Sequence, residues 1–282
     1  MKKILAIFAI VLLLIGGCTI KPIISTPSSV KEFGNIDSPQ KALVIGNSKY
    51  EYGPLVNPTN DANEVAEILK EMNFYVVKAT NLDLDEMTEV IGEFEKNLAK
   101  SRTGSDVALF YFSGHGAGID ADGKNYLFPI NNGNIEEETA VSGRAIHTDT
   151  ILTAMKTVNR SGVNLMFLDA CRDQPYIGSS KSRFRGGMYP PKSSVIGTVQ
   201  AYATAFGRTA SDNRKGRNSL YTKYLLKILQ VAKDTPVGIE DILMKVKELV
   251  KKDSKGKQAP SHIYSINGGK VCLGFKDCKQ PI

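Results

Sequence analysis

Two side chains that could act as a nucleophile and its base, His115 and Cys171, each follow an unbroken apolar run. His115 stands in Ser113-Gly114-His115-Gly116 after residues 107–112, and Cys171 comes shortly after residues 163–168. A thiol beside an imidazole ionises readily, and the thiolate attacks carbonyl carbons. Taken singly, Cys171 could be an inert buried thiol and His115 a histidine in a glycine turn. Taken together at the ends of two buried strands, the pair indicates nucleophilic catalysis.

The two apolar runs are typical of strands that are buried on both faces of a parallel sheet. In open α/β sheets, ligands bind outside the carboxyl ends of the strands. If the two strands are neighbours, the imidazole and the thiol therefore reach the same crevice. The backbone N–H groups of Gly116 and Cys171 could then donate to a developing oxyanion. Glycines on both sides of His115 leave the backbone bare enough for a substrate to approach.

The rest of the folded part alternates strand and helix patterns, which predicts an α/β fold with a mainly parallel sheet and helices on both faces. Asp83 is expected to begin one helix in a capping box with Glu86. Further strands are predicted at 42–46, 74–77 and 199–205, and helices at 61–72, 83–98, 148–158, 219–232 and 238–251. Residues 176–198 interrupt this alternation and indicate a long mobile loop. This loop carries four basic residues, namely Lys181, Arg183, Arg185 and Lys192.

Two motifs resemble the catalytic motifs of the caspase-like peptidases, and the nearest branch is the bacterial metacaspase-like or orthocaspase group. They are Ser113-Gly114-His115-Gly116 and Phe167-Leu168-Asp169-Ala170-Cys171-Arg172-Asp173. In this family the histidine precedes the cysteine by about fifty residues, and here the separation is 171 − 115 = 56. Residues 41–50, 203–207 and 211–212 resemble further family blocks, so that the similarity spans about residues 41–270.

The resemblance implies a caspase-like (caspase-hemoglobinase) fold. It places the catalytic domain at residues 41–282. Within it, residues 41–175 would be the large-subunit-like part, 176–198 the mobile loop and 199–282 the small-subunit-like part. The dyad would be His115 and Cys171, with the N–H groups of Gly116 and Cys171 as oxyanion donors.

The resemblance also implies a substrate. Caspases carry Gln-Ala-Cys, a small residue and then glycine, whereas this chain has Asp169-Ala170-Cys171-Arg172-Asp173. In metacaspases and paracaspases an acidic residue two before the cysteine lines the primary specificity pocket, and cleavage follows arginine or lysine. Asp169 matches that residue, and Asp212 falls where a second acidic pocket residue is expected. On their own, Asp169 could instead be a strand-end cap and Asp212 a solvated loop acid.

The resulting prediction is a cysteine endopeptidase that cleaves peptides or proteins after Arg or Lys. One alternative is a non-catalytic, membrane-tethered scaffold that binds basic segments, and another is a peptide ligase or transpeptidase. As in some relatives, self-cleavage is expected within the basic loop. Metacaspases are generally monomeric, which favours a monomer. No cofactor is indicated, and the sequence leaves open whether calcium activates the protein as it does some relatives.

The N-terminus is typical of an export signal. A basic start at Lys2 and Lys3 precedes an apolar run at residues 4–15, which is too short to span a membrane as a helix. Ile15-Gly16-Gly17-Cys18 resembles a bacterial lipobox, which predicts a signal peptide at 1–17, lipid on Cys18 and a linker at 18–40. The expected location is therefore the bacterial cell envelope, as a membrane-anchored lipoprotein. Plain signal-peptide cleavage or an uncleaved anchor are the alternatives.

Composition excludes several other classes. Of the 282 residues, 42% are hydrophobic and 23% charged, as in ordinary globular proteins. The net charge of +7 becomes 7 − 2 = +5 without residues 1–17, and the basic residues are scattered, so no nucleic-acid partner is predicted. The four cysteines, His147 and His262 lack metal-ligand spacing, and Asp120, Asp122 and Asn125 do not complete a calcium loop. Cys272 and Cys278 could pair as a disulfide or remain free thiols.

Overall fold

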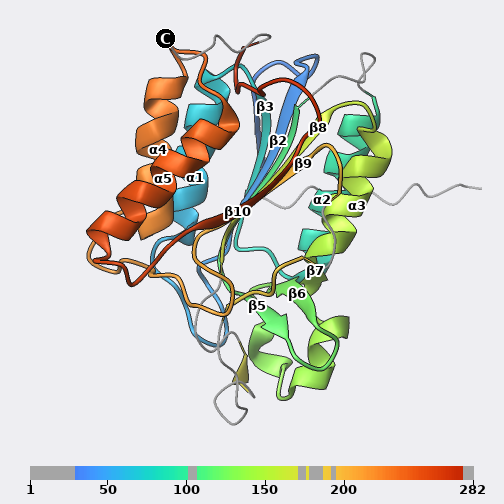
Figure 1. The fold of residues 1–282 in the computed structure, drawn as a ribbon. Helices are drawn as coiled ribbons and strands as arrows, with labels where there is room; N and C mark the ends of the chain where they lie inside the picture. Colours follow the sequence, from blue (N-terminus) through green and yellow to red (C-terminus); the bar gives the residue numbers. More distant parts are fainter. Residues whose placement is uncertain (1–28, 101–106, 171–175, 178–186, 192–194, 276–282) are drawn as a thin grey trace, which may run out of the picture.

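A seven-stranded sheet forms the centre of the computed structural model, which describes residues 29–100, 107–170, 176–177, 187–191 and 195–275 (Figure 1). The five inner strands are parallel, and the two edge strands are antiparallel to their neighbours. This confirms the predicted α/β class. From edge to edge the order is β1 (Lys31–Phe33), β3 (Tyr75–Thr80), β2 (Gln40–Gly46), β4 (Val107–Ser113), β8 (Val163–Asp169), β9 (Thr198–Tyr202) and β10 (Ser261–Ser265).

Helices cover both faces of this sheet (Figure 1). One face carries α1 (Pro58–Glu71), α4 (Leu220–Ala232) and α5 (Ile239–Asp253), and the other carries α2 (Leu84–Ala99) and α3 (Thr148–Val158). Along β4, Leu109 and Tyr111 point into the core under α1 and α4, while Phe110 and Phe112 point into the core under α2 and α3. Burial on both faces is the reason that the central strands are continuous apolar runs.

The helix ends follow their local chemistry. The side chain of Asp83 accepts the N–H of Glu86 at 2.9 Å, and the Glu86 side chain accepts the N–H of Asp83 at 3.0 Å. This confirms the predicted capping box at the start of α2. Helix α1 begins three residues before its predicted start because Pro58 fits the first turn, where no N–H is required.

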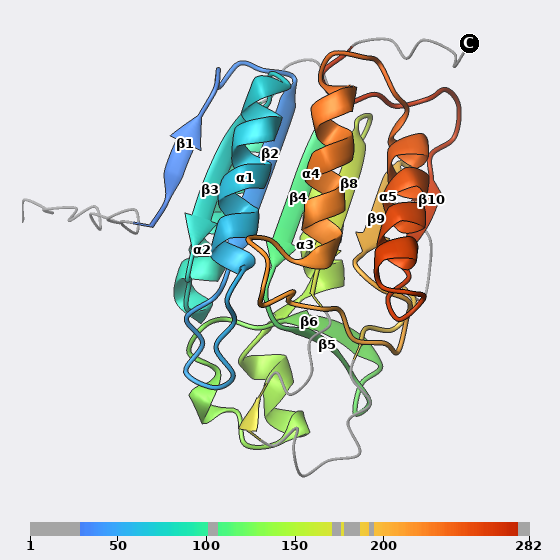
Figure 2. The same ribbon diagram turned by 90° about the vertical axis from the view of Figure 1, so that its left-hand side faces the viewer.

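A second, three-stranded sheet was not predicted. It consists of β5 (Gly116–Ile119), β6 (Lys124–Leu127) and β7 (Ile146–His147), in that order. Figure 2 shows β5 and β6 across the carboxyl ends of the central strands. The short 3₁₀ helices η1 (Asn132–Asn134) and η2 (Glu138–Gly143) lie in the connection between β6 and β7. This small unit has its own buried cluster, made of Tyr50, Ala117, Ile119, Tyr126, Phe128, Ile135, Val141, Ala145 and Tyr176.

Two predicted boundaries need correction. Residues 31–33, assigned to the linker, form the edge strand β1, in which Phe33 packs against the core. The ammonium groups of Lys70 and Lys78 lie 5.7 and 5.6 Å from the Phe33 ring centre, so cation–π contacts from α1 and β3 help to hold this short polar strand. Parts of the predicted mobile loop are also packed, because Tyr176 and Met188 are buried.

Two further predictions concern membranes and disulfides. In the described ranges, no helix is both long and apolar enough to cross a membrane. Residues 1–28, with the predicted signal and Cys18, lie outside the described residues. Cys272 is disulfide-bonded, which excludes the alternative of a free thiol there. Its pairing with Cys278, which is also outside the described residues, stays a prediction.

Candidate active site

The ends of β4 and β8 bring the two sequence motifs together. The strands pair in parallel, with Phe112 opposite Leu168 and Ser113 opposite Asp169. The N–H of Gly114 donates to the carbonyl of Asp169 at 3.2 Å, which extends the pairing past the strand ends. His115 and Cys171 each follow the last paired residue by two positions. The predicted neighbourhood of the two strands is therefore confirmed, while Cys171 itself lies outside the described residues.

The imidazole of His115 is held in a defined orientation. The side chain is 2% exposed, and its Nε2 atom lies 2.6 Å from the carbonyl oxygen of Gly53. A carbonyl oxygen can only accept a hydrogen bond, so Nε2 carries the proton of the neutral ring. The Nδ1 atom is then the basic nitrogen of that tautomer. This arrangement suits a general base that receives a proton at Nδ1.

Tyr50 supports His115 from the loop between β2 and α1. Its hydroxyl accepts the backbone N–H of His115 at 2.8 Å and donates to the carbonyl of Phe128 at 3.2 Å. The two rings lie with their centres 4.4 Å apart, tilted by 57°. Together with Gly53, Tyr50 fixes both the backbone and the ring of His115. The sequence drew attention to Tyr50 as part of a family-like block but did not assign it this contact.

The glycines that flank His115 are required by packing. A β-carbon on Gly114 would lie 2.4 Å from the hydroxyl oxygen of Tyr50. A β-carbon on Gly116 would lie 2.6 Å from Cε of Met188 and 2.7 Å from Cβ of Ala170. Gly116 is the first residue of β5 and is buried. Its proposed part in an oxyanion hole stays a prediction.

Asp169 is fully buried at the end of β8, with its carboxylate directed towards the start of α4. Its Oδ2 atom accepts a hydrogen bond from Oγ1 of Thr222 at 2.6 Å and another from the hydroxyl of Ser219. Ser219 is the N-cap of α4, and its hydroxyl accepts the N–H of Thr222 at 3.1 Å. Hydroxyl donors and a helix N-terminus both stabilise an ionised carboxylate.

A second buried carboxylate, Asp61, lies beside the first and was missed as a site residue. It is fully buried in the first turn of α1. Its Oδ1 atom accepts the N–H of Ser219 at 3.0 Å, and its Oδ2 atom accepts from the hydroxyl of Ser113 at 2.9 Å. Ser219 therefore binds Asp61 through its backbone and Asp169 through its side chain. The sequence did carry a signal for Asp61, because an aspartate stands among the apolar residues of the helix predicted at 61–72.

The negative charge of this pair affects the neighbouring phenols. Burial, followed by the charges of Asp61 and Asp169, raises the pKa of Tyr111 well above its ordinary value. Burial and the charge of Asp169 likewise raise the pKa of Tyr221. The two carboxylates therefore gather negative charge beside the carboxyl ends of β4 and β8.

Asp212 precedes Ser219 in the chain but makes different contacts from those of Asp61 and Asp169. It is buried, and its Oδ2 atom accepts the N–H of Val56 at 3.1 Å. Its backbone carbonyl accepts from the side-chain amide of Asn57, the N-cap of α1. Asp212 therefore holds the loop before α1, whose first turn carries Asp61. The reading of Asp212 as a solvated acid is wrong, and its contact with substrate stays a prediction.

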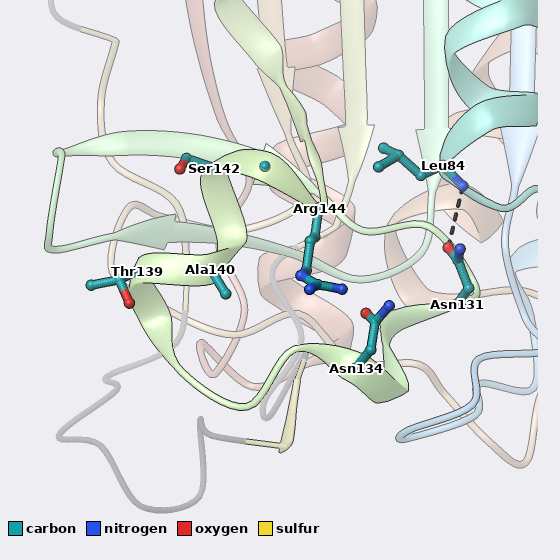
Figure 3. A pocket seen from close by; sticks show the side chains of 8 residues that line it. Leu84, Asn131, Asn134, Thr139, Ala140, Ser142 and Arg144 are labelled. Atoms are coloured by element: carbon teal, nitrogen blue, oxygen red, sulfur yellow. Dashed lines mark hydrogen bonds between the residues drawn. The ribbon is translucent and has the colours of Figure 1, made fainter.

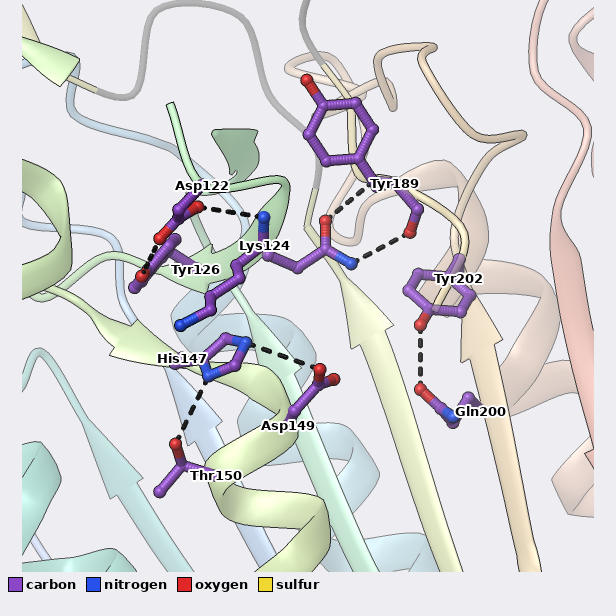
Figure 4. A network of polar contacts seen from close by, with 10 residues as sticks. Asp122, Lys124, Tyr126, His147, Asp149, Thr150, Tyr189, Gln200 and Tyr202 are labelled. Atoms are coloured by element: carbon purple, nitrogen blue, oxygen red, sulfur yellow. Dashed lines mark hydrogen bonds and ion pairs between the residues drawn. The ribbon is translucent and has the colours of Figure 1, made fainter. Parts of the chain in front are cut away.

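The other polar residues considered from sequence have local structural roles (Figure 4). His147 is the N-cap of α3, with Nε2 3.5 Å from the carboxylate of Asp149. Asp122 accepts from the hydroxyl of Tyr126 at 2.6 Å, and burial, followed by this contact with Asp122, raises the pKa of Tyr126. Among the described residues, no group of three or more His, Cys, Asp or Glu side chains could hold a metal ion.

A hollow of about 440 Å³ lies beside η1 and η2 (Figure 3). The guanidinium of Arg144 points into it, near Asn134, and the amide oxygen of Asn131 accepts the N–H of Leu84 at 3.2 Å. Its lining contains none of the residues that contact His115, Asp61 or Asp169. The hollow is therefore separate from the candidate active site.

Comparisons with known proteins agree with this geometry. The family model described as caspase domain, of peptidase family C14, matches residues 39–268. The human mucosa-associated lymphoid tissue lymphoma translocation protein 1 is 31% identical over 132 residues, and so is its mouse homologue. These matches cover 46% of this chain but only 15% and 14% of the human and mouse proteins.

Two solved structures share the fold. The Drosophila initiator caspase Dronc superposes with a TM-score of 0.60 at 13% identity, covering 88% of this chain and 87% of the other. Caspase-1 from Spodoptera frugiperda superposes with a TM-score of 0.60 at 17% identity, covering 88% of this chain and 95% of the other. At such low identities the likeness concerns the fold alone.

Proposed function

The chain belongs to the caspase-domain family of peptidases, and on that premise we propose that it is a cysteine endopeptidase that cleaves after arginine or lysine. The observation that carries the proposal is the pairing of Ser113 with Asp169, which brings the His115 loop and the Cys171 loop to adjacent strand ends. The buried carboxylates of Asp61 and Asp169 lie at the same strand ends and support a preference for a cationic side chain.

The reaction follows from these positions. The Cys171 thiol gives its proton to Nδ1 of His115, and the thiolate attacks the carbonyl carbon of the scissile bond. The oxyanion that forms receives hydrogen bonds from the N–H groups of Gly116 and Cys171. The imidazolium then protonates the leaving amine, and the C–N bond breaks to give a thioester. Water, which loses a proton to His115, hydrolyses the thioester and restores the thiol.

The substrate side chain is selected by charge. The guanidinium of arginine can pair with a carboxylate through two parallel hydrogen bonds, whereas the ammonium of lysine supplies one compact charge. Cleavage after Arg is therefore expected to be at least as fast as cleavage after Lys. An aspartate at the same place would bring like charges together in a poorly solvated pocket, so cleavage after Asp is expected to be negligible.

The proposed location is the bacterial cell envelope, with lipid on Cys18. This location is supported by the N-terminal sequence, in which a basic start is followed by an apolar run and then by Gly16-Gly17-Cys18. Two acyl chains on one residue are enough for stable anchoring. The remaining tether between Cys18 and β1 would then be shorter than the predicted linker, because β1 begins at Lys31.

A panel of fluorogenic peptides tests the function. The full chain, purified in detergent, is incubated with otherwise identical peptides that end in Arg, Lys or Asp, with and without calcium. Turnover of the Arg and Lys peptides, absent in Cys171→Ala, supports the proposal. Turnover of the Asp peptide alone contradicts the pocket assignment, and absence of turnover under every condition favours a non-catalytic scaffold. Mass spectrometry with an added amine separates hydrolysis from peptide ligation.

A further inference from the structure

Met188 packs beside two residues that are sequence neighbours of the dyad, Gly116 and Ala170. Its side chain is 1% exposed and belongs to the same buried cluster as Ala170, the residue before Cys171. Its Cε atom lies 2.6 Å from the point where Gly116 would carry a β-carbon, and Cβ of Ala170 lies 2.7 Å from that point. The methionine and Ala170 thus both pack against Gly116, the residue after His115.

The backbone around Met188 is fixed by contacts that do not involve the dyad. We call residues 187–189 the strap. The N–H of Gly118 in β5 donates to the carbonyl of Gly187 at 2.8 Å, and the N–H of Gly207 donates to the carbonyl of Met188 at 3.0 Å. The strap is therefore bound on one side to the small sheet and on the other to the loop after β9.

Asn125 of β6 holds the end of the strap with two hydrogen bonds. Its amide nitrogen donates to the carbonyl of Tyr189 at 2.9 Å, and its amide oxygen accepts the N–H of Tyr189 at 2.8 Å. Figure 4 shows Tyr189 close to β6, with its ring directed away from the Tyr202–Gln200 pair. The ring of Tyr189 also covers Gly118, where a β-carbon would lie 2.6 Å from Cδ2.

We propose that Met188 is a positioning residue of the dyad, and that the strap with its Asn125 clamp holds Met188 against Gly116, which follows His115, and near Ala170, which precedes Cys171. A methionine side chain fills an irregular gap between two turns without branching. Reacting groups must meet within a few tenths of an ångström, so a cavity at this place is expected to slow the chemical step. Substrate binding is expected to change little, because Asp61 and Asp169 are held by Ser219 at the start of α4.

This proposal rests on the proposed peptidase function, and its test compares three variants of the full chain in detergent. Met188→Ala removes the side chain, Met188→Leu nearly preserves its volume, and Met155→Ala is the matched control. Met155 is 0% exposed in the same buried cluster, but it belongs to α3. The kcat of Met188→Ala on the Arg peptide is expected to fall about thirtyfold with KM changed less than about threefold. Met188→Leu is expected to keep kcat within about threefold of wild type.

A second measurement does not depend on turnover. The rate at which iodoacetamide labels Cys171, followed by peptide mass spectrometry, reports the dyad in the absence of substrate. The Met188→Ala rate is expected to differ from wild type by more than about fivefold, and the Met155→Ala rate to match wild type. Equal losses of kcat in Met188→Ala and Met155→Ala at similar Tm would overturn the inference. An inactive wild type would contradict the proposed function. Labelling still tests the inference in that case, because an unchanged labelling rate of Cys171 in Met188→Ala would overturn it.

The role of the strap is tested by Gly187→Ala. Gly187 has φ +88°, and a β-carbon there would lie 2.5 Å from the backbone nitrogen of Arg208. Gly256, beyond α5, has φ +79° with nothing within 4 Å, so Gly256→Ala carries the same backbone strain without a collision. Gly187→Ala is expected to reproduce the loss of kcat in Met188→Ala, and Gly256→Ala to keep the wild-type value. Wild-type kcat in Gly187→Ala would show that the strap does not position the dyad.

Discussion

The hydroxyl of Tyr50 lies 2.8 Å from the backbone nitrogen of His115, and the two rings are in contact at 4.4 Å. A side chain from the loop after β2 therefore supports the turn after β4. Because this hydroxyl also donates to the carbonyl of Phe128, it joins the central sheet to the residue that follows β6. The orientation of His115 thus depends on both sheets.

Tyr50→Phe is expected to lower both activity and stability. The change leaves the N–H of His115 and the carbonyl of Phe128 buried without this partner, at a cost of about 1–3 kcal/mol in the free energy of unfolding. The kcat is expected to fall about tenfold, because the imidazole loses a fixed backbone. Thermal unfolding and peptide turnover measure the two effects. Tyr52→Phe, at a partly buried position in the same loop, serves as the control, and equal effects in both variants would contradict the role of Tyr50.

Cys171→Ala is expected to abolish turnover while the fold remains intact. His115→Ala is expected to lower kcat by a similar factor, about 10³-fold or more, and the double variant to lose no more than either single one. Turnover of the Arg peptide and far-UV circular dichroism provide the measurements. Substantial activity in Cys171→Ala would show that another residue is the nucleophile.

Asp61→Asn and Asp169→Asn are each expected to impair cleavage after Arg. Loss of one buried charge pair costs about 3 kcal/mol, which corresponds to roughly a hundredfold in kcat/KM. Iodoacetamide labelling of Cys171 is expected to be less affected, because the dyad remains. Asp149→Asn, at an exposed residue of α3, is the control. If Asp61→Asn cleaves Arg peptides as fast as the control does, Asp61 is not part of the pocket.

The sequence predicted the strands that carry the dyad because these are buried on both faces, and burial leaves a continuous apolar run. It did not predict β5, whose four residues include two glycines, or β10, whose residues are all half-buried at the sheet edge. Such strands depend on their partners rather than on their own composition.

The sequence predicted those residues of the site that stand in local motifs, such as His115 and Asp169. The Gly53 carbonyl that orients His115 has no side-chain signature, and it meets the imidazole across 62 positions of sequence. Asp61 becomes a neighbour of Asp169 only when α1 packs beside α4, because Ser219 at the start of α4 binds both carboxylates. Contacts of this kind arise only when distant elements pack together, so one sequence does not contain them as a pattern.

Cys18→Ser is expected to release the protein from the membrane fraction and to stop incorporation of labelled fatty acid. The reason is that a thioether-linked diacylglycerol supplies the anchoring free energy, and serine offers no thiol for it. Fractionation of cells and autoradiography measure the two outcomes. Equal membrane retention of both proteins, with no label in either, would exclude the lipoprotein assignment.

Self-cleavage is expected within the basic loop of residues 176–198, after Lys181, Arg183, Arg185 or Lys192. These residues have the side chains that the acidic pair would bind, and they lie in the same chain. Intact-mass analysis of wild type and Cys171→Ala measures the cut, and Asp169→Asn is expected to suppress it together with peptide cleavage. A wild-type chain that stays whole while it cleaves Arg peptides would exclude self-processing.

The pairing of β4 with β8 has a consequence for the order of events during folding. Phe112 and Leu168 are opposite each other in the sheet, yet they are separated by 168 − 112 = 56 positions of the chain. Such non-local pairings form slowly, because the entropy of closing a long loop is lost before the contacts are gained. An unfolded chain therefore carries His115 and Cys171 without a dyad, and the proposed peptidase would become competent only when the central sheet closes. On that proposal, a nascent chain that is still extended would cut neither itself nor its neighbours.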